Sequence, residues 1–204
     1  MPKARSAPPA AATAPHDVGR TRLAASRSAI ALFIEHGTSD FTVKQLVSHT
    51  GLSERTFYRY FPTKEDVVKP AIAEAIERIG AAIARRPRGE ALRDSLVAAF
   101  IDAWVAVPIQ RSQALAQVMN ETDSFRAVWQ QAFMAGASQW TAIMAERLGL
   151  APHTPQVMLG GAVVAVAARL ALENADPRNG SHAGELLAHY LELLGPNLFT
   201  VAIT

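Results

Sequence analysis

Apolar residues recur every three or four positions along most of this 204-residue chain, which is the period of a helix with one buried side. The clearest case is the segment 123–148, where Phe125, Trp129, Phe133 and Trp140 fall on a single face. No segment shows the strict alternation of a half-buried strand. The pattern therefore predicts an all-α protein with about nine helices.

Caps and helix breakers place the remaining helices. A first helix is expected over residues 20–36, and a fourth is expected to begin after Thr63 and to kink or restart near Pro70, because proline disrupts a helix interior. Residues 1–19 are rich in Ala and Pro and are predicted to form a disordered tail. Further helices are expected over 71–84, 90–107, 109–120, 154–174 and 181–194.

The segment 42–64 is the most informative part of the chain, because it predicts two short helices joined by a tight turn. Thr42 can cap the first helix, and Gly51 can take the left-handed conformation that ends it. Ser53 can cap the second helix, which buries Phe57 and leaves a polar, basic and aromatic face outside. This pattern is typical of a helix-turn-helix, whose second helix lies in the DNA major groove.

Short motifs within and around this segment carry a family resemblance. They are Gly37, Thr42-Val43, Gly51-Leu52-Ser53, Thr56-Phe57-Tyr58, Tyr60-Phe61 and Thr63-Lys64-Glu65. With them, the stretch from residue 20 to about residue 69 resembles the TetR family of one-component transcriptional repressors. The run from Ser53 to Val68 is similar to the actinobacterial branch that includes mycofactocin-type regulators. Val47 and Thr50 depart from the small Ala that is common in the family.

The resemblance implies two groups of DNA-contacting residues. Those in places that meet base edges or nearby phosphates are Lys44, Glu54, Arg55, Thr56 and Arg59. Those in places that usually hold the DNA backbone are Thr42, Ser53, Tyr58, Tyr60 and Lys64. The chemistry agrees, since Arg55 can contact a guanine in a bidentate manner and hydroxyl or ammonium groups hold register on phosphates. Glu54 accepts from a cytosine amine or pairs with a nearby arginine, and Tyr60 is divided between core and DNA.

The distribution of charge supports a DNA-binding head more than the net charge of +2 does. Residues 1–70 hold 10 basic against 6 acidic residues, a net of +4, whereas residues 71–204 hold 10 against 12, a net of −2. Arg20, Arg22 and Arg27 open the first helix. They form either a solvated face or a basic arm that contacts phosphates or the minor groove, and both alternatives stay open.

Enzymatic and membrane functions find little support in the sequence. The six histidines are scattered without metal-ligand spacing, and no glycine-rich phosphate loop is present, so no enzyme, metal site or cofactor is expected. The chain has no cysteine, so disulfides and thiolate metal sites are excluded. The most apolar run, 157–172, contains Arg169 and two glycines and is no membrane span. A cytoplasmic location follows as an expectation.

Aromatic and Met side chains concentrate in the middle helices. Stripes at helical spacing are usually plain core, but some of these residues are candidates to line a pocket for an apolar or aromatic effector. The candidates are Phe100, Trp104, Met119, Phe125, Trp129, Phe133, Trp140 and Met144. Gln117, Asn120 and Gln130 either supply polar contacts to that molecule or face solvent.

The helix over 157–172 is apolar almost all round, so it must be covered on every side. A second copy of the chain is the simplest cover, and the resemblance implies homodimerisation through the last two helices; the alternative is a core helix of a monomer. Three regions are thus expected: a disordered tail (1–19), a helix-turn-helix DNA-binding domain of three helices (20–66), and a helical ligand-binding and dimerisation domain (67–204). The predicted function is a transcriptional repressor that an apolar ligand releases from a palindromic double-stranded DNA operator. The alternative is a ligand-independent architectural DNA-binding protein.

Overall fold

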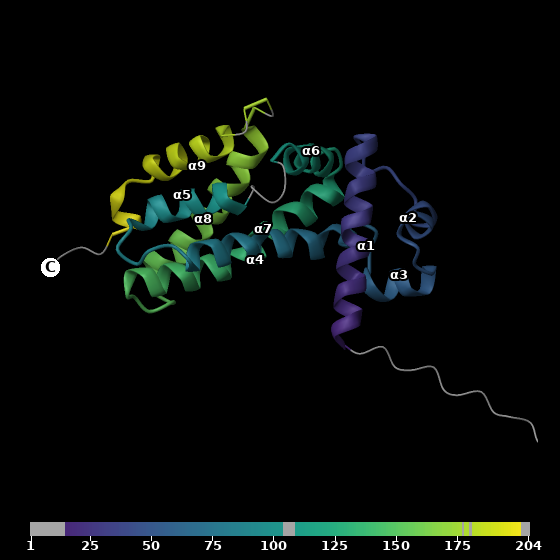
Figure 1. Cartoon of the computed structure of the whole chain (residues 1–204), viewed down its shortest axis with the longest axis horizontal. Coiled ribbons are helices and arrows are strands. Elements are labelled where there is room, and N and C mark those ends of the chain that lie inside the picture. The colour runs from purple at the N-terminus through teal and green to yellow at the C-terminus, as the bar shows by residue number, and fades with distance from the viewer. Residues whose placement is uncertain (1–14, 104–108, 177, 180, 201–204) are drawn as a thin grey trace, which may run out of the picture.

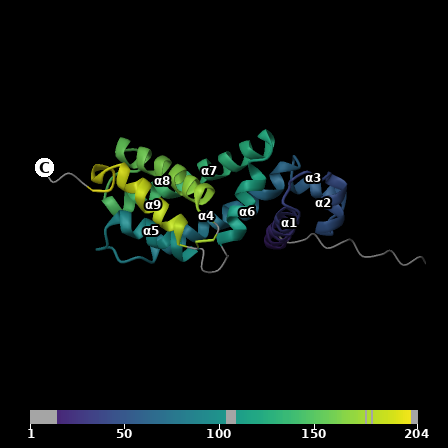
Figure 2. The ribbon, with the colours of Figure 1, turned by 90° about the horizontal axis from the view of Figure 1, so that it is seen from above.

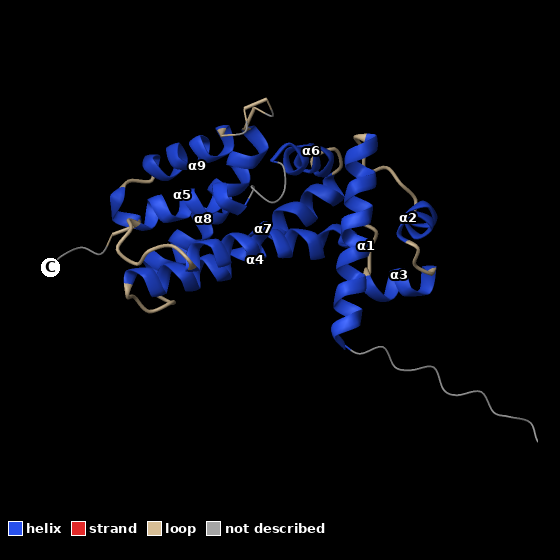
Figure 3. Ribbon diagram, viewed as in Figure 1, coloured by secondary structure: helices blue, strands red, loops and turns tan. Residues whose placement is uncertain are grey.

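The computed structural model describes residues 15–103, 109–176, 178–179 and 181–200. Over these residues it holds nine α-helices, two short 3₁₀ helices and no strand, which confirms the all-α fold (Figure 3). The helices are α1 (Pro15–His36), α2 (Val43–Thr50), α3 (Glu54–Tyr60), η1 (Glu65–Val68), α4 (Lys69–Ala84), α5 (Leu92–Ala103), α6 (Ile109–Met119), α7 (Asp123–Leu148), α8 (Pro155–Asn174), α9 (His182–Leu193) and η2 (Pro196–Leu198).

The molecule is elongated, with a small head at one end and a larger helical body at the other (Figure 1). The head consists of α1, α2 and α3, and α1 lies between the other two helices and the body in both views (Figures 1 and 2). Its core is aromatic and aliphatic, with Phe33, Leu46, Phe57 and Phe61 all completely buried. This core fixes α3 against α1 and so sets which face of α3 points outward.

Local caps shape the helix-turn-helix as the sequence predicts. Thr42 and Gln45 form a reciprocal capping box at the start of α2, and Gly51 ends that helix with a φ of 70°. Ser53 caps α3 by accepting a hydrogen bond from the Thr56 amide, at 3.2 Å. The turn between the two helices is therefore specified by side chains within a few residues of it.

The first helix begins earlier than the sequence pattern predicts. It starts at Pro15, so residues 15–19 are helical although they were expected to belong to a disordered tail. Proline suits the first turn of a helix because its fixed φ matches and its missing N–H has no partner there. The rest of the predicted tail, residues 1–14, lies outside the described residues.

The junction at Pro70 takes the form of a restart. The 3₁₀ helix η1 ends at Val68, and α4 begins at Lys69 with Pro70 in its first turn. Within η1, the Asp66 carboxylate accepts a hydrogen bond from the Thr63 amide at 2.9 Å and lies 2.7 Å from the Lys69 ammonium. Burial alone would raise the pKa of Asp66, but these hydrogen bonds outweigh it and hold the pKa below its usual value.

Helices α7 and α8 form the central pair of the body. Their close approach depends on Gly160 and Gly161, because a Cβ on Gly161 would lie 2.2 Å from Thr141 Oγ1 and one on Gly160 would lie 2.3 Å from Met144 Cε. These two glycines of α8 thus serve a contact within the chain. Among the described helices, α8 alone is long and apolar enough to cross a membrane, and 50% of that window is buried inside the protein.

A polar network closes the end of the body farthest from the head. Glu90 accepts from Arg86 Nε at 2.8 Å and from Ser95 Oγ at 2.6 Å, while Arg147 on α7 donates to the Glu90 carbonyl at 2.8 Å. The hydrogen bonds from Arg86, and next those from Ser95, lower the pKa of Glu90 to about 2. The network ties the loop between α4 and α5 to the last turn of α7.

Candidate nucleic-acid interface and ligand cavity

Helix α3 presents four of the ten predicted DNA-contacting side chains on its outer face. Glu54, Arg55 and Arg59 are exposed and Tyr58 is 48% exposed, whereas Phe57 on the opposite side is completely buried. This division follows from the head core, which takes Phe57 and leaves the next residues outside. The outer face of α3 carries both charge signs, an aromatic ring and donors that suit base edges and phosphates.

Three charged residues of this surface have free polar groups. Lys44, Glu54 and Arg55 have no hydrogen-bond or ion-pair partner among the described residues. The structure therefore gives no support to the alternative that Glu54 pairs with a nearby arginine. A guanidinium and an ammonium without protein partners need not break a bond before they contact DNA.

The two predicted backbone-contacting hydroxyls at helix starts are used inside the head. Thr42 Oγ1 donates to Gln45 Oε1 at 2.8 Å, and Ser53 Oγ donates to Thr56 Oγ1 at 2.9 Å. Thr56 is half-buried beside them. These groups therefore fix the first turns of α2 and α3, whose exposed ends carry partial positive charge.

Two arginines pack on aromatic rings where α1 meets α3. The Arg59 guanidinium lies 5.1 Å from the Tyr60 ring centre, and that of Arg22 lies 5.9 Å from the Phe61 ring centre. Arg22, Arg59 and Tyr60 line a shallow recess together with Val18. Tyr60 is only 8% exposed, so its ring belongs mainly to the core.

Lys64, the last of the predicted DNA contacts, and Arg27 of the basic start of α1 both contact the body. Lys64 Nζ lies 5.5 Å from the ring centre of Phe125 on α7, and its side chain is half-buried. Arg27 pairs with Glu74 on α4. The three arginines at the start of α1 are all exposed, and this ion pair makes Arg27 part of the joint between head and body.

Phe125 belongs to this joint. Its ring lies edge-on to Phe33 of α1, with centres 5.6 Å apart, and it is 1% exposed. Next to it, Glu121 accepts from the Ser39 amide at 3.3 Å, and Ser124 donates to Glu65 at 3.3 Å. The start of α7 therefore reaches into the head.

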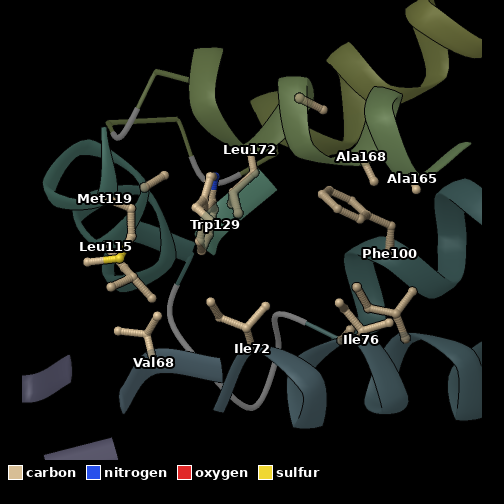
Figure 4. Close-up of a cluster of buried hydrophobic side chains, with 14 of the residues drawn as sticks. Val68, Ile72, Ile76, Phe100, Leu115, Met119, Trp129, Ala165, Ala168 and Leu172 are labelled. Carbon is tan, nitrogen blue, oxygen red and sulfur yellow. The ribbon is translucent and has the colours of Figure 1, made fainter. Parts of the chain in front are cut away.

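A cavity of about 380 Å³ lies inside the body next to the head. Its wall comes from α1, α4, α5, α6, α7 and α8. The lining residues are Arg27, Ile30, Ile34, Ala71, Ile72, Glu74, Ala75, Ile76, Arg78, Ile79, Phe100, Arg111, Ser112, Leu115, Trp129, Phe133 and Leu172. Figure 4 shows Ile72, Phe100, Trp129 and Leu172 around a common space. A volume of this size fits a small organic molecule.

The aromatic wall of the cavity is held by hydrogen bonds. Trp129 Nε1 donates to Glu173 at 2.7 Å, and Arg169 Nη1 donates to the same carboxylate at 2.6 Å. Phe133 lies edge-on to Trp129 with ring centres 4.8 Å apart. This arrangement fixes the Trp129 ring in place before any molecule enters.

The cavity includes some of the predicted pocket residues and adds charged ones. Phe100, Trp129 and Phe133 line it. Four others, Met119, Phe125, Trp140 and Met144, are buried in the core elsewhere, and Trp104 lies outside the described residues. The polar candidates Gln117, Asn120 and Gln130 do not line it.

Sequence reasoning missed the charged lining residues Arg27, Glu74, Arg78 and Arg111. Each looks like an ordinary surface charge on its own helix. Glu74 and Arg78 are four residues apart on α4, but Arg27 and Arg111 lie far from them in the sequence, and no local pattern connects the three segments. Among the described residues, no group of three or more His, Cys, Asp or Glu side chains is placed to hold a metal ion.

Comparison with known proteins agrees with the geometry of the head. Residues 27–71 match the family described as "Bacterial regulatory proteins, tetR family", and this range spans α2, α3 and the C-terminal part of α1. The head is therefore similar to the DNA-binding domain of that family. A curated relative, the HTH-type transcriptional regulator TcmR of Streptomyces glaucescens, is 33% identical over 99 residues, or 48% of this chain. The match covers 44% of TcmR, so this chain aligns with less than half of that relative.

Solved structures extend the likeness in fold to the body. A TetR transcriptional regulator from Rhodococcus sp. RHA1 gives a TM-score of 0.60 at 17% identity, covering 90% of this chain and 98% of that one. NalD of Pseudomonas aeruginosa, the secondary repressor of the MexAB-OprM multidrug efflux pump, gives 0.51 at 17% identity, covering 87% and 96%. At these identities the likeness shows a shared fold. The resemblance to the mycofactocin-type branch stays a prediction.

Proposed function

We propose that this protein is a transcriptional repressor that binds a palindromic operator as a homodimer and releases it when a small, largely apolar molecule enters the cavity. The observation that carries the proposal is the pairing of a TetR-family head with a cavity whose wall includes α1 of that head. We further propose the predicted division into a DNA-binding domain (20–66) and a ligand-binding and dimerisation domain (67–204), acting in the cytoplasm.

DNA binding rests on the outer face of α3. Arg55 can form two hydrogen bonds with a guanine edge, and Lys44 at the start of α2 can reach a guanine or a phosphate. Each chain has one such helix, so a two-fold dimer presents two. They enter successive major grooves about 34–36 Å apart, or a multiple of that distance, which requires a palindromic site.

Dimerisation rests on a face that we call the α8–α9 face, formed by Met158, Leu159, Val166, Leu193 and Leu194. These are five of the eight large apolar side chains that are exposed among the described residues, with exposures between 37% and 71%. Helices α8 and α9 pack against each other. Gln156 also binds the carbonyl of Asn197 at 2.8 Å, which holds the chain after α9 beside the start of α8. An apolar face of this kind is typical of a protein interface.

Release rests on the position of the cavity. A ligand that fits one arrangement of α1 and α4 better than another shifts the population toward that arrangement, and DNA disfavours the ligand by the same factor. A coupling of ~1–3 kcal/mol is enough for a useful switch. The cavity favours this function over the alternative of a ligand-independent architectural protein, which has no need of one.

Selection of binding sites from random DNA with the full-length chain tests the function. We expect one palindromic sequence, bound by two chains, and an affinity that falls when a cavity ligand is added. Binding without sequence preference would contradict the repressor and favour the architectural alternative. Cavity ligands that leave operator affinity unchanged would contradict release alone.

A further inference from the structure

The lining of the cavity carries an excess of positive charge. Three arginines, Arg27, Arg78 and Arg111, line it with a single carboxylate, that of Glu74. Arg27 Nε donates to Glu74 Oε2 at 3.2 Å, and Arg78 Nη1 lies 3.3 Å from the same oxygen. One carboxylate thus serves two guanidinium groups on α1 and α4.

One of these arginines has unused donors. Arg111 is exposed and has no hydrogen-bond or ion-pair partner among the described residues. An anion in the cavity would supply acceptors to its guanidinium group.

The rest of the lining has the opposite character. Phe100, Trp129, Phe133 and Leu172 present ring and aliphatic surface, and the Trp129 indole N–H already donates to Glu173 outside the lining. A ligand in the cavity therefore meets both apolar surface and guanidinium groups.

We infer that the cavity binds a small amphipathic anion, with its apolar ring or chain against Trp129 and Phe133 and its acidic group, a carboxylate or sulfonate, at Arg111. The inference rests on the proposed role of the cavity as the effector site and adds the charge of the effector. A neutral molecule of the same shape would contact the apolar lining and leave the Arg111 guanidinium without a partner.

A matched pair of fluorescent dyes tests the charge. The probes are 8-anilinonaphthalene-1-sulfonate and N-phenyl-1-naphthylamine, which share a ring system and differ in the sulfonate. We expect Arg111→Gln to weaken sulfonate binding by about tenfold or more, the value for loss of one charge-assisted contact. Binding of the neutral dye should stay within about twofold, since the apolar wall is unchanged. Arg111→Lys should restore part of the sulfonate affinity.

Controls locate the site and separate the two proposals. Arg93→Gln removes an exposed arginine of α5 outside the cavity and should change neither affinity. Trp129→Phe should reduce energy transfer from tryptophan to the bound sulfonate dye. Equal losses for both dyes, no loss for either, or failure of the sulfonate dye to bind would overturn the anion inference. Arginine-dependent sulfonate binding without effect on operator affinity would uphold it and overturn only the proposed release.

Discussion

The head and the body of this protein use charged side chains in opposite ways. In the head, Lys44, Glu54 and Arg55 are exposed and have no partners among the described residues, and they stand on short helices fixed by caps. In the body, Arg78 and Arg111 line a cavity that six helices enclose. The head thus offers a preformed surface to a large partner, whereas the body offers an internal space to a small one. The two meet at α1, which carries the core of the head on one side and a wall of the cavity on the other.

Phe125→Ala should cause the largest change, because it removes the contact that joins the two regions. The side chain is fully buried, so we expect the free energy of unfolding to fall by ~3–5 kcal/mol. Urea denaturation measures the loss, and Met134→Ala is the control, because a side chain that is 47% exposed should cost less. Similar losses for both variants would show that the joint adds nothing special.

The double variant Leu159→Lys, Leu193→Lys should cause the second-largest change, which is a weaker dimer. The two side chains are 58% and 71% exposed in one chain, so the substitutions leave the fold intact but bring like charges together in a dimer. We expect dimer dissociation to become easier by about 2.7 kcal/mol, or roughly a hundredfold. Light scattering across a dilution series measures this. An unchanged dimer would place the interface away from the α8–α9 face.

Arg55→Ala tests whether the outer face of α3 reads the DNA sequence. We expect a loss of ~1–3 kcal/mol on the best operator and relaxed preference at one base pair, because the bidentate contact is removed. Lys64→Ala is the matched variant. It should weaken all sequences alike and reduce the salt dependence by about one counterion. Unchanged sequence preference in Arg55→Ala would mean that another face of α3 reads the DNA.

A lower pH should cause the smallest change in stability, and it should act through Glu90, at the end of the body far from the head. The pKa of Glu90 is lowered from its ordinary 4.5 to about 2, so the stabilisation from this carboxylate is complete above pH 4.5 and is lost as the pH falls toward 2. Thermal unfolding of the wild type should show a step in that range that Glu90→Gln lacks. A parallel pH dependence in the two proteins would assign the acid sensitivity to other carboxylates, such as Asp66.

The sequence predicts more of the head than of the body, for a physical reason. Thr42, Gly51 and Ser53 act on neighbours within three or four residues, so their spacing predicts the helix-turn-helix directly. The bounds of α7 also follow from local signals, Thr122 as a cap and Gly149 as a stop. The cavity depends on which sides of six helices meet. Arg27 and Arg111 lie far apart in the chain, so a single sequence contains no sign that they share a space.

Even Phe125 shows this limit. Its place on the stripe of α7 predicts that it is buried, but not that its partner is Phe33 in the other region.

That contact also bears on how portable the DNA-binding part is. A fragment cut after residue 66 would remove the Phe125 ring that covers Phe33, and the Ser39 amide would lose its acceptor on Glu121. A chimeric regulator made by grafting a foreign head onto this body would inherit the mismatched half of the joint. The unit of exchange is therefore two separate pieces of sequence, the head and the short segment from Glu121 to Phe125 that completes it.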